Sequence, residues 1–449
     1  MKHPLALLDI LLLAPTVVAA RCLHFRPLST GTVAALSRAA LLLTASSGIA
    51  QEYDGEGGRR PIVAREIPVV RWTAARDPLN FRYDFLENLK TTTLLKATPE
   101  TGTWNHHQHI FYVGGVFYAV WDTQIRDENG AGQHGVMRRS TDQGKTWTPV
   151  EPLFPPSARN VPAADPYPET RFQTFSGFAI VDGVLYAVTD VAEWTTAGKK
   201  KVKPRRKIGR MCRSIQSDGT LGLIFWLLPT APKPVEGFPA YPAGDPAHVA
   251  KIEHYFRQPG QEIQLDFAPR AHPDSDDNHV MAEPVPSYQL RDGTWVRLYR
   301  DSGARGARTL KEEEATKSRR NYASFSFDGG RTWTVPTRTS FPDACARSNA
   351  GKLPDGQVYV INNVLPLATK QGGRSLLAIS LSRDGLNFDR MAVIRFLPPP
   401  PRYEGRSKAV GYAYPHSVIV GEHLWVIYSV NKEDIEITRI PLSELMDLK

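Results

Sequence analysis

The sequence predicts an all-β protein, a six- or seven-bladed β-propeller of four-stranded antiparallel blades. Two observations predict this fold. A turn motif of the form Ser-x-Asp-x-Gly-x-Thr-Trp stands in full at 140–147 and 326–333, and a copy at 382–388 has phenylalanine in place of tryptophan. A hairpin pattern, in which a Gly-containing turn leads into a run of aromatic and β-branched residues, recurs at intervals of about 65 residues.

The turn motif has a physical reason for each residue type. Asp328 can accept hydrogen bonds from nearby amides, the glycines supply positive φ, and Trp333 can cover the turn. Because the motif recurs, we expect one such turn between the third and fourth strands of several similar sheets.

The number of copies of the hairpin pattern gives the number of repeated units. Its copies begin at Gly114, Asp182, Asp292, Asp355 and Gly421. The long gap between the second and third copies leaves room for one degenerate unit, and Pro229–Asp277 is expected to hold this unit or a lid. The last unit has three evident strands, so we expect the strand Ile67–Trp72 to pair beside Ile435–Ile440 and close the ring, which removes two sheet edges.

The amino-terminal region differs from the rest. Arg38 precedes the apolar run Ala39–Ala45, and small residues follow up to Gln51, which is a secretory signal pattern. We therefore expect a signal region over 1–50, a flexible leader over 51–65 and a single propeller domain over 66–449, in a secreted or periplasmic protein. An uncleaved membrane anchor is the alternative.

Composition limits the partners. The net charge of +9 favours an anionic partner, either a nucleic acid or an acidic polysaccharide. The three cysteines form no C-x-x-C pattern, and neither a metal nor another cofactor is expected. Cys212 and Cys345 could stay as thiols or pair with each other. A monomer is expected.

Propeller geometry assigns residues to faces. The starts of first strands and the loops between second and third strands open on one face around the central channel, where a rigid scaffold can position functional groups. Arginine binds carboxylates bidentately, and His, Tyr and Glu move protons or attack. We predict that His106, His107, Arg300 and Tyr414 converge there in one pocket. The candidate residues on this face are His106, His107, His134, Arg210, Glu283, Arg300, Arg347, Tyr414, His416 and Lys432.

The turn motif resembles the Asp box of the sialidase superfamily, and the resemblance covers roughly residues 66–445. The segment from Ala282-Glu283-Pro284 to Tyr299-Arg300 is similar to the sialidase segment that carries a catalytic glutamate and a carboxylate-binding arginine. Tyr414 lies in the last unit, where sialidases place a tyrosine nucleophile. The chain departs from sialidases at the first strand, Asn105–Ile110, which lacks their Arg-Ile-Pro motif.

Other phrases resemble a neighbouring group of propeller enzymes, the ulvan lyases and the α-L-rhamnosidases that act on rhamnosyl-glucuronate. These phrases are His106-His107, Ala131–His134 and Gly411–His416. The resemblance implies that His106 or His107 acts as a general acid or base.

Three functions remain open at this point. The first is an exo-glycosidase on an acidic glycan that contains uronic or sialic acid, with Glu283 and a histidine handling protons, Arg300 and Arg347 holding the carboxylate, and His134, Arg210, His416 and Lys432 also binding substrate. The second is a polysaccharide lyase that uses histidine and Tyr414 for β-elimination on a uronate. The third is a propeller that binds glycans without reacting. All three predict an anionic oligo- or polysaccharide as partner, with no nucleic acid and no membrane after processing.

Overall fold

The computed structural model describes eleven segments, and for some strand residues it describes the backbone alone. The chain divides into two units, 1–49 and 50–449, and every described residue lies in the second. The signal region predicted over 1–50 therefore lies outside the described residues, as does most of the leader. The described residues are 51–53, 59–61, 67–75, 83–157, 171–197, 201–261, 279–284, 286–304, 319–367, 372–405 and 407–448.

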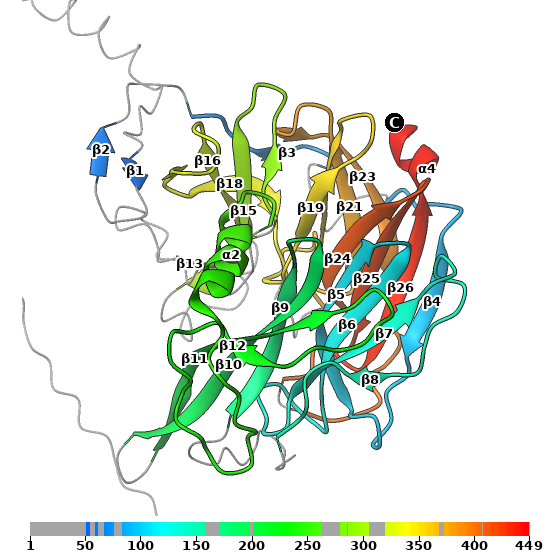
Figure 1. The fold of residues 1–449 in the computed structure, drawn as a ribbon. Coiled ribbons are helices and arrows are strands. Elements are labelled where there is room, and N and C mark those ends of the chain that lie inside the picture. The colour runs from blue at the N-terminus through cyan, green and yellow to red at the C-terminus, as the bar shows by residue number, and fades with distance from the viewer. Residues whose placement is uncertain are drawn as a thin grey trace, which may run out of the picture. The chain divides into compact units, whose positions relative to one another are not determined.

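Five antiparallel sheets, each built on a row of four strands, form the blades of the described fold and confirm an all-β propeller of four-stranded blades (Figure 1). The first blade contains β5 (Trp104–Val113), β6 (Val116–Gln124), β7 (His134–Ser140) and β8 (Glu151–Pro152). The second contains β9 (Arg171–Val181), β10 (Val184–Ala197), β11 (Lys201–Ile215) and β12 (Phe225–Trp226). The third contains β13 (His279–Pro284), β15 (Trp295–Ala304), β16 (Arg320–Ser326) and β18 (Thr337–Pro342), and β14 (Tyr288–Gln289) also pairs with β15.

The two remaining blades follow the same plan. The fourth contains β19 (Asn349–Lys352), β20 (Val358–Asn362), β21 (Leu376–Ser382) and β23 (Arg390–Phe396). The fifth contains β24 (Tyr412–Val420), β25 (His423–Val430), β26 (Asp434–Pro441) and β4 (Lys90–Leu95). Short strands lie outside the blades: β1 (Gln51–Tyr53) pairs with β2 (Arg59–Pro61) and β17 (Trp333–Thr334), and β3 (Arg71–Trp72) pairs with β22 (Asn387–Phe388).

The blade count differs from the prediction. The described residues form five blades, one fewer than the lower predicted count. In the insert expected to hold a hidden unit, the described part carries α2 (Pro246–Arg257), whose Ile252 and Phe256 pack against the second blade. Asp245 caps this helix by accepting a hydrogen bond from the amide of His248. None of the described helices, which include α4 (Leu442–Met446), is long and apolar enough to cross a membrane.

The ring closes with a different strand from the one predicted. β4 pairs antiparallel with β26, and the hydroxyls of Thr91 and Thr438 lie 2.8 Å apart across the pair. The prediction for Ile67–Trp72 was wrong, because β3 instead pairs in parallel with β22. Val70 and Trp72 of that segment are buried between the third and fourth blades, where the indole of Trp72 donates to Ser380 Oγ at 3.1 Å.

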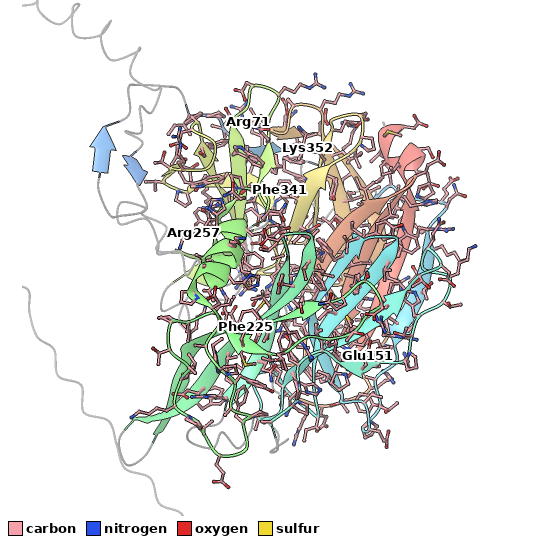
Figure 2. All side chains as sticks on the ribbon, viewed as in Figure 1. Arg71, Glu151, Phe225, Arg257, Phe341 and Lys352 are labelled. Atoms are coloured by element: carbon pink, nitrogen blue, oxygen red, sulfur yellow. The ribbon has the colours of Figure 1, made fainter. Side chains whose placement is uncertain are left out.

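The Asp-box turns have the expected internal bonding. Asp328 accepts hydrogen bonds from the amide of Thr332 at 2.9 Å and from its hydroxyl at 2.7 Å, while Ser326 Oγ accepts from Gly330 N at 2.8 Å. The turn at 140–147 repeats these bonds, and the turn at 382–388 keeps the serine, aspartate and amide bonds. Figure 2 shows side chains filling the spaces between the blades, and the labelled Phe341 is fully buried.

The first Asp box also packs against the fifth blade. Gly144 has φ +77°, and a Cβ added there would stand 2.6 Å from Trp425 Cη2. Trp425 is buried and packs on Phe117 with ring centroids 4.9 Å apart, so it has little freedom to move away. Gly144 therefore allows two blades to approach closely.

Replacing Gly144 with alanine is expected to destabilise the fold more than a left-handed backbone alone would. Gly183 is the control, because its φ is +79° and a Cβ there would meet nothing within 4 Å. We expect Gly183→Ala to cost about 1 kcal/mol from backbone strain, and Gly144→Ala about 1–3 kcal/mol more from overpacking. Urea unfolding measures both, and equal losses would show that the contact with Trp425 does not constrain the turn.

Candidate functional site

The strand register separates the Asp boxes from the candidate site. In the first blade, Ser140 of the Asp box pairs with Phe117, next to the β5–β6 turn. His106 of β5 pairs with Asp122 of β6, at the end of these two strands that lies away from the β5–β6 turn. The candidate residues of β5 therefore lie at the end of the blade opposite the Asp box, as the assignment to faces predicted.

Tyr414 is the centre of the candidate site. It stands near the start of β24, is 7% exposed, and has the unusual φ of +57°. Its hydroxyl accepts a hydrogen bond from Arg300 Nη1 at 2.6 Å. The guanidinium carbons of Arg347, Arg374 and Arg300 lie 4.7, 5.3 and 5.7 Å from the centroid of its ring. Three cations from the third and fourth blades thus surround a tyrosine of the fifth blade.

Arg374 is a member of this cluster that the sequence analysis did not select. It is 6% exposed, and its Nη2 donates to the carbonyl of Cys345 at 2.9 Å. Its Nε and Nη1 have no hydrogen-bond partner among the described residues. Since unpaired buried donors are costly, two donors of this guanidinium are suited to an anionic ligand. Its place just before β21 is the signal that could have identified it.

His106 lies against the ring of Tyr414. The two ring centroids are 4.1 Å apart, and His106 Nδ1 is 2.8 Å from Ser429 Oγ. Burial, followed by the positive charge of Lys432, holds the pKa of His106 well below its ordinary value. The imidazole is therefore neutral at pH 7, and its Nε2 has no hydrogen-bond partner within the described part of the chain.

His107 bridges two carboxylates. Its Nδ1 is 3.0 Å from Asp122 Oδ2, and its Nε2 is 3.4 Å from Glu128 Oε1. Burial raises the pKa of Asp122, against the effect of its hydrogen bond with His107. Burial also acts to raise the pKa of Glu128, but Lys432, with Nζ at 2.7 Å, and His107 hold that pKa well below its usual range. Glu128 is therefore ionised. Asp122 orients the imidazole of His107 through its contact with Nδ1.

Asp343 holds the segments that carry two of the arginines. It is fully buried, and it accepts hydrogen bonds from the amides of Asp301, at 2.6 Å, and Ala346, at 3.3 Å. These residues directly follow Arg300 and directly precede Arg347. Burial, opposed by these amides, raises the pKa of Asp343 to about 7. Asp343 is a positioning residue, and nothing in its sequence context distinguishes it from other aspartates.

The structure brings together most, but not all, of the predicted site residues. His106, His107, Arg300, Arg347 and Tyr414 form one cluster, and Lys432 joins it through Glu128. The catalytic and binding roles of these residues remain predictions.

The other predicted residues have different surroundings. His416 packs on His109 with centroids 4.6 Å apart, and His134 Nδ1 lies 2.7 Å from the carbonyl of Gly132. The ion pairs described for Arg210 are with Asp190 and Glu253 of the second blade and α2. The side chain of Glu283 lies outside the described residues, although its neighbour Ala282 pairs with Arg300.

The described residues contain no group of three or more His, Cys, Asp or Glu side chains that could hold a metal ion. Cys212 and Cys345 are both free thiols, and Cys212 is buried in the second blade. The possible disulfide between them is therefore not formed.

Comparison with known proteins identifies similar folds. The family described as BNR repeat-like domain matches residues 290–426. A solved structure titled "Sialidase" is 24% identical with a TM-score of 0.60, over 83% of this chain and 35% of that one. The sialidase of Trypanosoma rangeli in complex with sialic acid is 12% identical with a TM-score of 0.48, over 81% of this chain and 60% of that one. No curated protein sequence matches the chain.

These comparisons support a sialidase-like propeller with BNR repeats. The chain spans only 35% and 60% of the lengths of the two sialidases. The closer resemblance to ulvan lyases and rhamnosidases is not tested by these matches and stays a prediction.

The partly buried His416 predicts a loss of stability in mild acid. Burial lowers the pKa of His416 to about 4, so the unfolded chain, with a pKa near 6.5, binds its proton first as the pH falls. Stability that depends on neutral His416 is therefore present above about pH 6.5 and is lost towards pH 4. His416→Asn keeps an acceptor for the amide of Ile110, which His416 Nδ1 bonds at 3.4 Å.

We expect the difference in unfolding free energy between wild type and His416→Asn to shrink by about 1–2 kcal/mol between pH 7 and pH 5. Urea unfolding at several pH values measures it. His254→Asn, on the exposed side of α2, is the control. A difference that does not change with pH would show that His416 takes up its proton equally well in the folded state.

Proposed function

We propose that this protein is a glycoside hydrolase acting on an acidic glycan, and that it binds the sugar carboxylate with Arg300, Arg347 and Arg374. One observation carries the proposal: three guanidinium groups lie within 6 Å of the ring of Tyr414, in a place that is almost fully buried. Gathering like charges out of water is unfavourable, and an anionic ligand would bind the two donors of Arg374 that have no partner among the described residues. The sialidase-like fold supports the same class of substrate.

The tyrosine and the histidines supply the chemistry in this proposal. Tyr414 Oη attacks the anomeric carbon, and its negative charge in the transition state is stabilised by the hydrogen bond from Arg300. Glu283 takes the tyrosine proton, and His107, oriented by Asp122, protonates the departing sugar oxygen. Water then cleaves the tyrosyl–sugar bond, giving a proton to His107, while Tyr414 recovers its own from Glu283.

A lyase reaction is the second candidate, and one contact favours it. His106 and Tyr414 are two proton-transfer groups with ring centroids 4.1 Å apart, beside arginines that would neutralise a uronate. In such a reaction one group removes the proton next to the carboxylate and the other protonates the leaving oxygen. The expected location, secreted or periplasmic, and a monomeric state are part of the proposal and rest on the sequence pattern alone.

A screen of acidic polysaccharides with two readouts separates the candidates. We expect new reducing ends without ultraviolet absorbance, because hydrolysis forms no double bond. Absorbance from an unsaturated uronate would favour the lyase instead. Binding without either signal would leave a glycan-binding propeller. Tyr414→Phe should reduce turnover by about 10²–10⁴, the range for losing a group that transfers protons or attacks, with the Tm unchanged.

Arg374→Ala tests the binding of the carboxylate. We expect a drop in kcat/KM of about 10²–10³ on the substrate found in the screen, since a buried charge-assisted interaction is lost. Arg395→Ala is the matched control: its guanidinium also lies over tyrosine rings, 5.0 Å from that of Tyr412, but it pairs with Glu436 at 3.0 Å. Equal effects of the two changes on kcat/KM would contradict the proposed role of Arg374.

A further inference from the structure

We infer that a cavity beside the Tyr414 cluster is a second sugar subsite, which binds another acidic unit of the same glycan. The cavity has a volume of about 410 Å³ and is lined by Thr103, Ile125, Arg126, Tyr403 and Glu404. This volume falls within the usual range of small-molecule sites. The inference rests on the proposed function for the class of ligand, but the cavity itself is independent of the reaction.

The residues that line the cavity lie close in sequence to residues of the candidate site. Thr103 lies just before β5, three residues before His106, and Arg126 lies two residues before Glu128. Since a strand advances about 3.3 Å per residue, the cavity lies about 10–13 Å from His106 and His107 along the chain. Tyr403, which also lines the cavity, donates its amide to Glu433 at 2.9 Å, and Glu433 follows Lys432 in the sequence.

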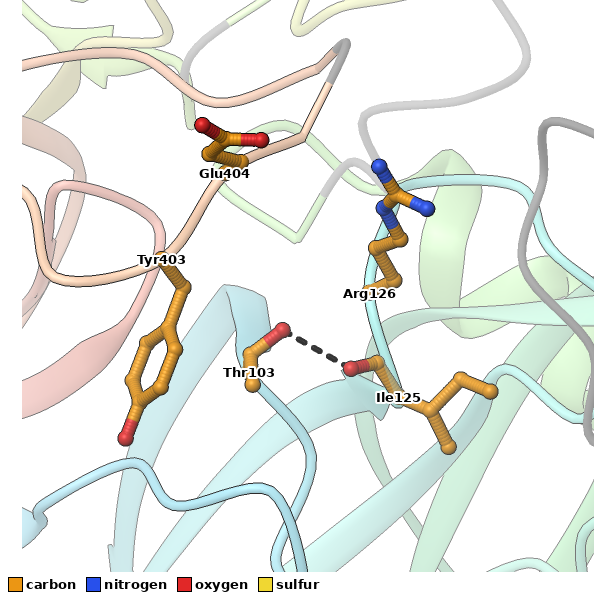
Figure 3. A pocket seen from close by; sticks show the side chains of 5 residues that line it. All are labelled: Thr103, Ile125, Arg126, Tyr403 and Glu404. Carbon is orange, nitrogen blue, oxygen red and sulfur yellow. Dashed lines mark hydrogen bonds between the residues drawn. The ribbon is translucent and has the colours of Figure 1, made fainter.

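The lining suits an acidic sugar. Figure 3 shows Arg126 on one side of the cavity, with Tyr403 and Glu404 on the other and Thr103 between them. Arg126 is exposed, and its guanidinium has no ion pair or hydrogen bond with any described residue, so it can bind a carboxylate or sulfate. Glu404 can accept bonds from sugar hydroxyls, and Ile125 offers apolar surface to the carbon face of the ring.

The other side of the cavity is held rigid. The Tyr403 hydroxyl donates to the carbonyl of Ala97 at 3.0 Å. Arg402 and Lys408 lie 5.1 and 5.8 Å from its ring centroid, but both also pair with carboxylates, Arg402 with Asp434 and Lys408 with Glu433 at 3.7 Å. Their charge is therefore already balanced, and Arg126 is the cation that faces a ligand. Glu404, across the cavity from Arg126, would repel a second anionic group, so the lining fits one acidic unit with its charge against Arg126 and its hydroxyls towards Glu404.

Binding as a function of oligomer length tests the subsite. The probes are galacturonate, glucuronate–rhamnose and sialyl oligosaccharides of one to six units, with neutral maltooligosaccharides as controls. Calorimetry uses the full chain with Tyr414→Phe, which is expected to slow turnover by about 10²–10⁴. We expect affinity for one acidic series to rise about tenfold or more from one unit to three, as expected for an added charge-assisted contact, and no such rise for the neutral series.

Arg126→Ala should abolish this gain with length and leave the affinity for the single unit within about twofold. Arg291→Ala, an exposed arginine in the turn before β15, should leave both unchanged. The inference is wrong if no acidic series binds more tightly as it lengthens, or if Arg126→Ala keeps the gain. Failure of the proposed function looks different, because Arg374→Ala would then leave binding of the single unit unaltered.

Discussion

The gathering of three guanidinium groups around Tyr414 is the constraint on which the rest of the site depends. Like charges repel, and burial strengthens that repulsion. The structure offsets part of it with the tyrosine ring, the carbonyl of Cys345 and the buried carboxyl of Asp343, which fixes the segments of Arg300 and Arg347. These partners leave two donors of Arg374 without a hydrogen-bond partner among the described residues, and the proposed anionic ligand would occupy them.

That gathering is possible because the propeller brings blades that are distant in sequence to one end. Tyr414 comes from the fifth blade, whereas His106 and His107 come from the first, and the closing strand β4 joins the fifth blade to the chain's amino-terminal side. The amide of Asn105 donates to the carbonyl of Lys432 at 3.0 Å, which ties the first strand of one blade to the loop of the other. Ring closure therefore positions both histidines over the tyrosine.

The sequence predicted the repeated parts of this structure better than the single ones. Asp boxes and Gly-containing hairpins are local patterns, so they revealed the blades and assigned residues to faces. The closing strand Lys90–Leu95 has no such pattern, and its three threonines do not mark it as the strand that pairs with β26. Ile67–Trp72 is more apolar and was chosen instead, but it packs between two blades. Arg374 was missed because its role depends on Tyr414, 40 residues later and in another blade. The sialidase resemblance expects an arginine on the first strand; here Arg374 of the fourth blade supplies a third guanidinium, and histidines hold the first-strand position.

Four residues in or next to the Tyr414 cluster have a left-handed backbone although they are not glycine. His107, Cys345, Tyr414 and Lys432 all have φ between 54° and 57°, where a side chain other than glycine is strained by about 1–2 kcal/mol. Glycine would relax the backbone at each of them, and at His107, Tyr414 and Lys432 it would also remove a side chain of the site. Selection for heat resistance alone would therefore favour the loss of this site, and persistence of these three side chains in a lineage would indicate that the site is under selection for its chemistry.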